Sequence, residues 1–150
     1  MSRQVKNIIT ITVFLICIGL VNIAGQNIEI EIRGMNAFTF ILITAVLVQI
    51  IFFIPSFLLK TEKYYDLVGS LTYIATVSLA YFAVDDKTMI DSIIYFYVMV
   101  WASRLGIYLF RRVRNDGKDV RFEKAKRHFF WFLQYWMGQA LWVSLTACAA

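Results

Sequence analysis

Long apolar segments alternate with short polar connections along the whole chain. Five segments are apolar: residues 8–25, 35–59, 66–84, 89–110 and 129–150. A helix that crosses the hydrocarbon core of a bilayer needs about 20 mostly apolar residues, and these segments are about that long. No useful stretch shows the apolar–polar alternation of a β-strand. The pattern predicts an all-α, polytopic integral membrane protein with about five transmembrane helices, forming a single membrane domain over residues 1–150.

The first segment has a second interpretation. It follows the basic residues Arg3 and Lys6 and ends in the small residues Ala24 and Gly25, as a cleaved signal peptide does. Its length and the further apolar segments favour a retained helix. Cleavage would leave the topology of the remaining chain unchanged.

The charges are unevenly distributed between the connections. The net charge is +5, and twelve Lys and Arg lie in the N-terminal tail and the second and fourth connections, against two on the opposite side. The positive-inside rule therefore predicts a cytoplasmic N-terminus and a cytoplasmic basic loop, residues 111–127. The membrane is the endoplasmic reticulum or another endomembrane in a eukaryote, or the inner membrane in a bacterium. Charge between membrane helices indicates a lipid bilayer and an anionic ligand or headgroup as partners, and no nucleic acid.

The sequence gives little indication of a metal site or a disulfide bond. Cys17 and Cys148 both lie in apolar segments and resemble small buried hydrophobic residues. His128 is the single histidine, which excludes a site built from several histidines. We expect no metal site.

One arginine lies inside the fourth apolar segment. Arg104 precedes Arg111 by seven residues, or about 10 Å of helix. It belongs to a stripe of aromatic and cationic residues at helical spacing, namely Tyr97, Trp101, Arg104, Tyr108 and Arg112. The stripe indicates either a cytoplasm-facing pocket for a phosphate or other anion, or an arginine that reaches lipid phosphates beside an interfacial aromatic belt.

A second polar stripe, which includes Asp66, Ser70 and Tyr73, lies on the third segment. Tyr73 is placed either to donate a proton to a bound carbonyl or to bond a neighbouring helix. The amides of Gln49, Gln134 and Gln139 connect helices or line a pocket. In the basic loop, Asn115-Asp116-Gly117 is a turn signal. Its last basic residues, Lys124, Lys126 and Arg127, are typical of a solvated face that touches anionic lipid.

Four blocks of residues resemble the steroid 5-alpha-reductase-like superfamily, and more closely its largely uncharacterised branch of polytopic membrane proteins. The blocks are Glu62 to Tyr73, Trp101 to Arg112, Gly117 to Phe122 and Gln139 to Val143. The Trp-x-x-Arg-Leu block at Trp101 and the Asp-x-Arg block at Asp119 carry most of the resemblance. It covers the chain from about Phe53 to Val143.

The resemblance implies an NADPH-dependent reductase that delivers a hydride to an activated carbon–carbon double bond of a lipid-like or sterol-like substrate. It places Arg104, Arg112, Asp119 and Arg121 around a cytoplasmic cofactor pocket, with the arginines contacting phosphates and Asp119 orienting them. Trp101 belongs to the same cofactor-binding block. Tyr73 is the candidate catalytic acid.

Members of this superfamily carry a further C-terminal half that closes over the cofactor, and the sequence ends in an apolar run at residues 144–150. We therefore expect a truncated reductase, which would bind NADPH poorly unless a helix partner supplies the missing half. The alternative is a non-catalytic membrane scaffold or regulator that pairs with a full-length relative. A transporter or channel is disfavoured, because the chain has no internal repeat and no charged pathway through the bilayer.

Overall fold

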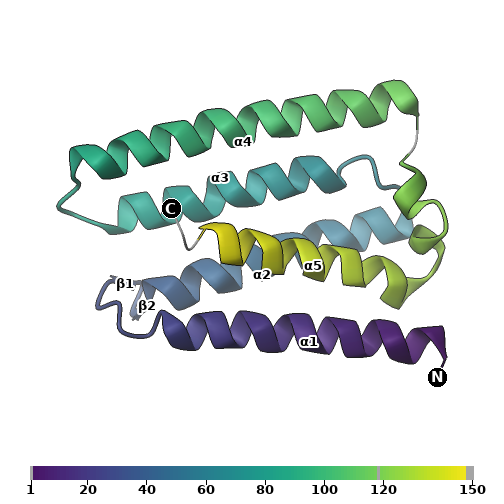
Figure 1. Cartoon of the computed structure of the whole chain (residues 1–150), viewed down its shortest axis with the longest axis horizontal. Helices are drawn as coiled ribbons and strands as arrows, with labels where there is room; N and C mark the ends of the chain where they lie inside the picture. Colours follow the sequence, from purple (N-terminus) through teal and green to yellow (C-terminus); the bar gives the residue numbers. More distant parts are fainter. Residues whose placement is uncertain (1, 118, 148–150) are drawn as a thin grey trace.

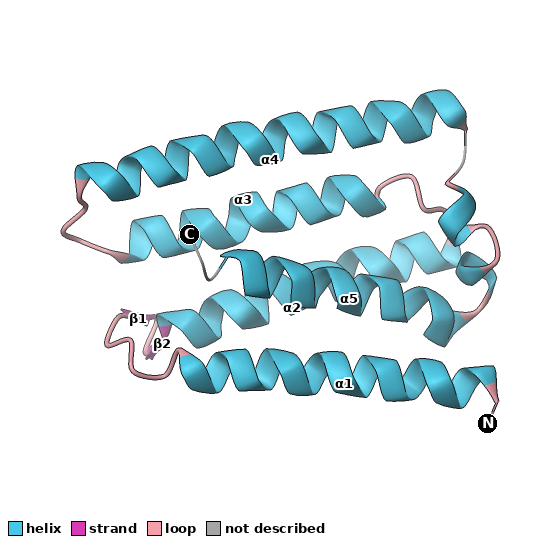
Figure 2. Ribbon diagram, viewed as in Figure 1, coloured by secondary structure: helices cyan, strands magenta, loops and turns pink. Residues whose placement is uncertain are grey.

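The computed structural model describes residues 2–117 and 119–147. The long helices are α1 (Arg3–Ala24), α2 (Ala37–Leu58), α3 (Tyr65–Ala83), α4 (Met89–Asp116) and α5 (Phe129–Ala147). A two-residue hairpin, β1 (Glu31–Ile32) and β2 (Met35–Asn36), joins α1 to α2. Two short 3₁₀ helices, η1 (Val120–Phe122) and η2 (Ala125–Arg127), join α4 to α5. The chain is all-α apart from the hairpin, as the apolar pattern predicts (Figure 2).

The five long helices lie roughly side by side in an elongated bundle (Figure 1). α3 and α4 form a hairpin at one edge, and α5 packs against α1, α2 and α3. The N-terminus lies at the same end of the bundle as η1 and η2, and the β hairpin lies at the opposite end. The last three residues of the fifth apolar segment, Cys148 among them, lie outside the described residues.

The helix boundaries follow from local capping chemistry. The Thr88 side chain accepts a hydrogen bond from the Asp91 N–H, and the Asp91 carboxylate accepts one from the Thr88 N–H, so α4 begins in a capping box. α4 ends at Gly117, which adopts the left-handed conformation with φ of 76°. The helix therefore continues six residues beyond the predicted apolar segment, and the predicted turn signal at 115–117 is its C-terminal cap.

α5 contributes to every buried hydrophobic cluster of the described residues. Phe132 and Trp136 are fully buried and pack against Phe53 of α2. Val68 of α3, Met137 of α5 and Phe122 of η1 complete the largest buried cluster. The outer helices instead expose many large apolar side chains, for example Leu20 and Phe96. An apolar exterior around a mixed core is what a bilayer environment requires.

Four helices in the described part of the chain, α1 to α4, are long and apolar enough to cross a membrane. α5 is not among them, although the sequence pattern predicts five crossings. It carries Gln134 and Gln139 together with three Trp residues and one Tyr, which lower its hydropathy.

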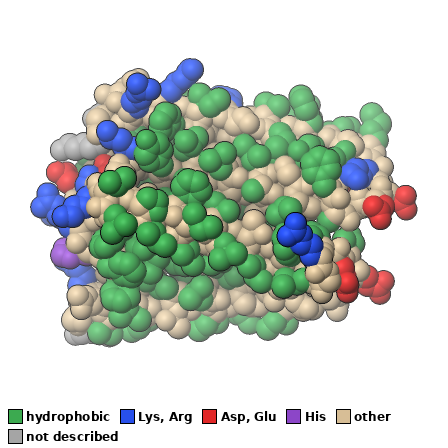
Figure 3. All heavy atoms as spheres, turned by 180° about the vertical axis from the view of Figure 1, so that it is seen from behind, with side chains coloured by type: hydrophobic (Ala, Val, Ile, Leu, Met, Phe, Trp, Pro, Cys, Tyr) green, Lys and Arg blue, Asp and Glu red, His purple; other side chains and the backbone are tan. Residues whose placement is uncertain are grey.

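The charged residues gather at the two ends of the bundle. Figure 3 shows most Lys and Arg side chains at one end of the bundle, whereas Asp and Glu side chains are visible at both ends and outnumber Lys and Arg only at the other. The basic end holds the N-terminal residues, the α2–α3 connection and the segment from Arg111 to Arg127. Between the ends the visible surface is largely apolar.

Candidate functional site

Four charged side chains from three segments of the chain meet at the basic end of the bundle. Arg121 of η1 lies 3.4 Å from the Asp66 carboxylate, measured from Nη2 to Oδ2. Arg112 of α4 lies 3.7 Å from the same Asp66 oxygen and 3.9 Å from Asp119 Oδ2. We call Asp66, Arg112, Asp119 and Arg121 the ion cluster. It joins the first turn of α3, the last turns of α4 and the segment that follows.

Asp119 and Arg121 form the tightest pair of this cluster. The Arg121 Nε donates to both Asp119 carboxylate oxygens at 3.0 Å, and its Nη2 donates to Oδ2 at 2.5 Å. Asp119 Oδ1 also caps η1 by accepting from the Arg121 backbone N–H at 3.0 Å. These hydrogen bonds hold the pKa of the Asp119 carboxyl below its usual range. The same bonds raise the pKa of the Arg121 guanidinium.

The ring of Phe122 fixes the segment that carries this pair. Phe122 is 1% exposed, and its ring centroid lies 4.7 Å from that of Tyr65 and 4.9 Å from that of Tyr135. The Tyr65 hydroxyl donates to the Tyr135 carbonyl at 2.9 Å, which ties α3 to α5 beneath the ring. The segment is therefore anchored in the core and leaves Arg112 and Arg121 at the surface.

Arg104 is exposed on α4, about two helical turns before Arg112 of the ion cluster. It lines an open hollow of about 630 Å³ whose six lining residues all belong to α4: Arg104, Ile107, Tyr108, Arg111, Arg112 and Asn115. Among the described side chains, no carboxylate lies within 4 Å of Arg104 or Arg111. Arg112 belongs to both groups, so the hollow and the ion cluster are contiguous.

Trp101 and Tyr73 meet in a different pocket, farther from the basic end along α4 and bordered by the exposed rings of Trp101 and Trp142; we call it the inner cavity. The Trp101 and Tyr73 rings pack edge to face with centroids 5.1 Å apart. They line a cavity of about 260 Å³ together with Trp142 and Thr146 of α5. The Tyr73 hydroxyl shares a short hydrogen bond with the Thr146 hydroxyl, which donates to the Trp142 carbonyl at 2.7 Å. The structure thus gives Tyr73 the helix-to-helix bond that the sequence offered as one interpretation, at the wall of a cavity.

The six predicted site residues therefore fall into three places. Asp119 and Arg121 lie in the ion cluster, and Arg112 joins that cluster to the Arg104 hollow. Trp101 and Tyr73 line the inner cavity. Sequence reasoning did not select Asp66 or Glu62 as site residues. The signal that identifies them is the four-residue spacing of two carboxylates just where the third apolar segment begins.

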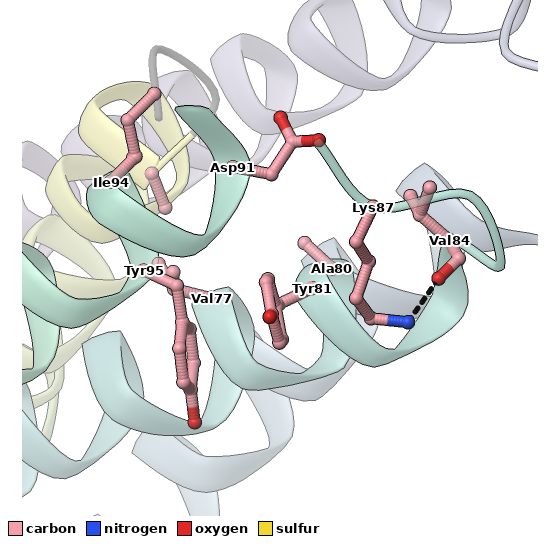
Figure 4. Close-up of a pocket in the computed structure, with 9 residues that line it drawn as sticks. Val77, Ala80, Tyr81, Val84, Lys87, Asp91, Ile94 and Tyr95 are labelled. Atoms are coloured by element: carbon pink, nitrogen blue, oxygen red, sulfur yellow. Dashed lines mark hydrogen bonds between the residues drawn. The ribbon is translucent and has the colours of Figure 1, made fainter. Parts of the chain in front are cut away.

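The opposite end of the α3–α4 hairpin holds another pocket, of about 160 Å³ (Figure 4). Its polar groups already have partners. Lys87 Nζ donates to the Val84 carbonyl, Asp91 caps α4, and the Tyr81 and Tyr95 rings stack at 4.3 Å. These contacts close the hairpin, and we assign no ligand to the pocket.

The intramembrane amides connect helices. Gln49 of α2 is fully buried and donates to the Thr72 hydroxyl of α3 at 2.8 Å. The amide of Gln139 on α5 lies against Gly69, where a Cβ atom would come within 2.3 Å of its Nε2. The described residues contain no group of three or more His, Cys, Asp or Glu that could hold a metal ion.

The site residues all fall within one region of family similarity. A family model described as "Protein of unknown function (DUF1295)" matches residues 51–150, which is two thirds of the chain. The matched region begins inside α2 and includes the ion cluster, the arginine-lined hollow and the inner cavity, while α1 lies outside it. No curated protein and no solved structure matches the chain. The chain belongs to the DUF1295 family.

Proposed function

We propose that this protein is a membrane-embedded, NADPH-dependent reductase of the steroid 5-alpha-reductase-like superfamily. Its substrate is a lipid-like molecule with an activated carbon–carbon double bond. One observation carries the proposal: Arg112, Asp119 and Arg121, which the resemblance selects as cofactor residues, converge at the basic end beside the Arg104 hollow.

The hollow has the chemistry that a dinucleotide phosphate requires. Three guanidinium groups, from Arg104, Arg111 and Arg112, line one open surface, and a guanidinium binds phosphate oxygens in a bidentate manner. Asn115 adds an amide, and Tyr108 is an exposed aromatic ring. NADPH, when bound, supplies the hydride for reduction of the double bond.

The remaining predicted residues have separate roles in this proposal. Asp119 holds the Arg121 guanidinium in place, and Arg121 presents its exposed edge to a phosphate. Trp101 lies eleven residues before Arg112, or about 16 Å along the helix axis. It forms the wall of the inner cavity, where the Tyr73 hydroxyl acts as the acid that protonates the substrate.

We also propose that α5 is a fifth crossing and that the basic end faces the cytoplasm. α5 runs beside α1, α2 and α3, and its polar residues are tolerated because neighbouring helices cover them. The excess of Lys and Arg at the end that holds the N-terminus and the basic loop supports this orientation.

NADPH binding to the purified chain in detergent tests the proposed function. Arg104→Ala should weaken binding by about tenfold or more, because a hydrogen bond between charged groups contributes about 1.5–3 kcal/mol. Arg114→Ala is the matched control, since Arg114 is exposed on the same helix but does not line the hollow. Equal losses in the two variants would indicate a general charge effect and contradict a specific site.

One feature favours a non-catalytic scaffold or regulator that pairs with a full-length relative. The ion cluster contains two carboxylates and two guanidinium groups, so its charges balance without a ligand, as in a purely structural clamp. Absence of saturable NADPH binding to the wild-type protein would support this alternative.

A further inference from the structure

Glu62 is a buried carboxylate outside the set of predicted site residues. It lies in the connection between α2 and α3 and is 4% exposed. Its Oε2 pairs with Lys126 Nζ at 2.7 Å, and its Oε1 accepts a hydrogen bond from the Asp119 backbone N–H at 3.2 Å. Both carboxylate oxygens therefore contact the segment that follows α4.

The burial of this charge requires an explanation. A single ion pair seldom compensates fully for removing a carboxylate from water. The segment that follows α4 already has an apolar anchor in Phe122. What Glu62 adds is a bond at one particular place, the backbone of the residue that caps η1. A carboxylate that accepts from a backbone N–H fixes position, which an apolar contact does not.

A relay of contacts leads from Glu62 to the surface. Glu62 holds the Asp119 backbone, and the Asp119 carboxylate holds the Arg121 guanidinium. Asp66, one helical turn beyond Glu62 in sequence, holds both Arg121 and Arg112. The side chains of Arg121 and Arg112 nevertheless remain 53% and 41% exposed. Their outer edges are oriented while still open to a ligand.

We infer that Glu62 is a positioning residue for the ion cluster, whose exposed Arg112 and Arg121 face a bound anion. It sets the place of Asp119, and Asp119 sets the orientation of Arg121 before any ligand arrives. An anion then binds without the free-energy penalty of ordering the segment. The identity of the anion as NADPH rests on the proposed function, whereas the positioning of the segment by Glu62 does not.

Two double variants separate positioning from charge. In Glu62→Gln with Lys126→Met, no buried charge is left unpaired, and the Gln oxygen can still accept from the Asp119 N–H. In Glu62→Leu with Lys126→Met, the charges are removed equally and that acceptor is lost. The comparison isolates one hydrogen bond, because Lys126 is absent from both variants.

Limited trypsin cleavage after Arg121 and Lys124 reports the opening of the segment in the full-length protein, with NADPH affinity measured in parallel. Cleavage after Arg33, in the exposed turn of the β hairpin at the opposite end of the bundle, is the control for changes outside the basic end. We expect the Leu variant to be cleaved at the basic end at least about tenfold faster than the Gln variant, with equal cleavage at Arg33. Its NADPH affinity should fall about fivefold or more relative to the Gln variant.

Equal cleavage of the two variants at the basic end would overturn the inference, and so would a parallel increase at Arg33, which indicates general destabilisation. If neither the wild type nor the variants bind NADPH, the proposed function fails. The cleavage comparison still decides whether Glu62 positions the segment.

Discussion

The carboxylate of Asp119 links the stability of the basic end to pH. Its folded pKa lies below the usual value because Arg121 donates hydrogen bonds to the charged form. The stabilisation is therefore complete above the unfolded-state pKa of about 3.9 and is lost as the pH falls through the lower folded pKa.

We predict that Asp119→Asn lowers stability at pH 6 by about 1 kcal/mol or less, because Arg121 is half exposed and solvent screens the pair. The difference between wild type and variant should stay constant above the unfolded-state pKa and shrink as the pH falls below it, vanishing only below the lowered folded pKa of Asp119, where the wild-type carboxyl is also neutral. Thermal unfolding in detergent, at several pH values from 6 down through the acid range in which the folded protein persists, measures it. A constant difference across that range would argue against an electrostatic origin.

Tyr73 is either a catalytic acid or a residue that only bonds a neighbouring helix, and one substitution distinguishes these two roles. If its hydroxyl is the catalytic acid, Tyr73→Phe should reduce turnover of an activated double bond by about a hundredfold or more while NADPH affinity stays unchanged. Loss of its bond to Thr146 alone would lower stability by about 1 kcal/mol and leave turnover intact. Thr146→Val is the control, since it removes the same bond and keeps the phenol.

At the scale of helices, close packing between α3 and its neighbours depends on glycine. A Cβ atom at Gly69 would lie 2.3 Å from Gln139 Nε2 of α5, and one at Gly106 of α4 would lie 2.7 Å from Ser70 Cβ of α3. Both glycines therefore let neighbouring helices approach α3, as small residues do in membrane bundles.

We predict that Gly69→Ala destabilises the bundle by about 1–3 kcal/mol, because the methyl group displaces the Gln139 amide. Gly19→Ala in α1 is the matched control, since no atom lies within 4 Å of its added Cβ, and alanine favours a helix. Thermal unfolding of both variants makes the comparison. Equal stability of the two variants would show that α3 and α5 can move apart at this contact without lowering the free energy of unfolding.

The helix pattern was predictable and the helix arrangement was not. Apolar length and capping residues such as Thr88 and Gly117 act locally, so the helices are recognisable from the sequence. The position of α5 at the centre depends on contacts with three other helices. Its low hydropathy makes sense only once those contacts cover Gln139 and bury Trp136.

At the scale of the whole molecule, charge divides the bundle into a basic and an acidic end (Figure 3). The proposed orientation places the basic end in the cytoplasm. In a background with both native cysteines replaced by Ser, Asp86→Cys should react with a membrane-impermeant maleimide from the non-cytoplasmic side. Lys63→Cys should react only after permeabilisation, because the α2–α3 connection lies at the basic end. The reverse labelling pattern would contradict the orientation.

The candidate site was predictable in part, and only through resemblance. Arg112, Asp119 and Arg121 were selected by their sequence blocks, and the structure brings them together. Trp101 and Arg104 come from the same block as Arg112 but lie at different heights along α4, so they line different cavities. The contacts of Glu62 span more than fifty residues, a separation at which no local pattern carries information.

The sequence by itself determined a helical membrane protein with charge concentrated at one end. Hydropathy, helix capping and the charge of a connection each depend on residues close together in the sequence. They therefore act on each helix in the bilayer independently of the rest of the fold. Only the tertiary structure decided which charges meet, which arginines remain open and which helix lies at the centre. Those outcomes depend on contacts between segments distant in sequence. Because the interior is closely packed, moving one helix by a few ångströms would change which side chains it contacts.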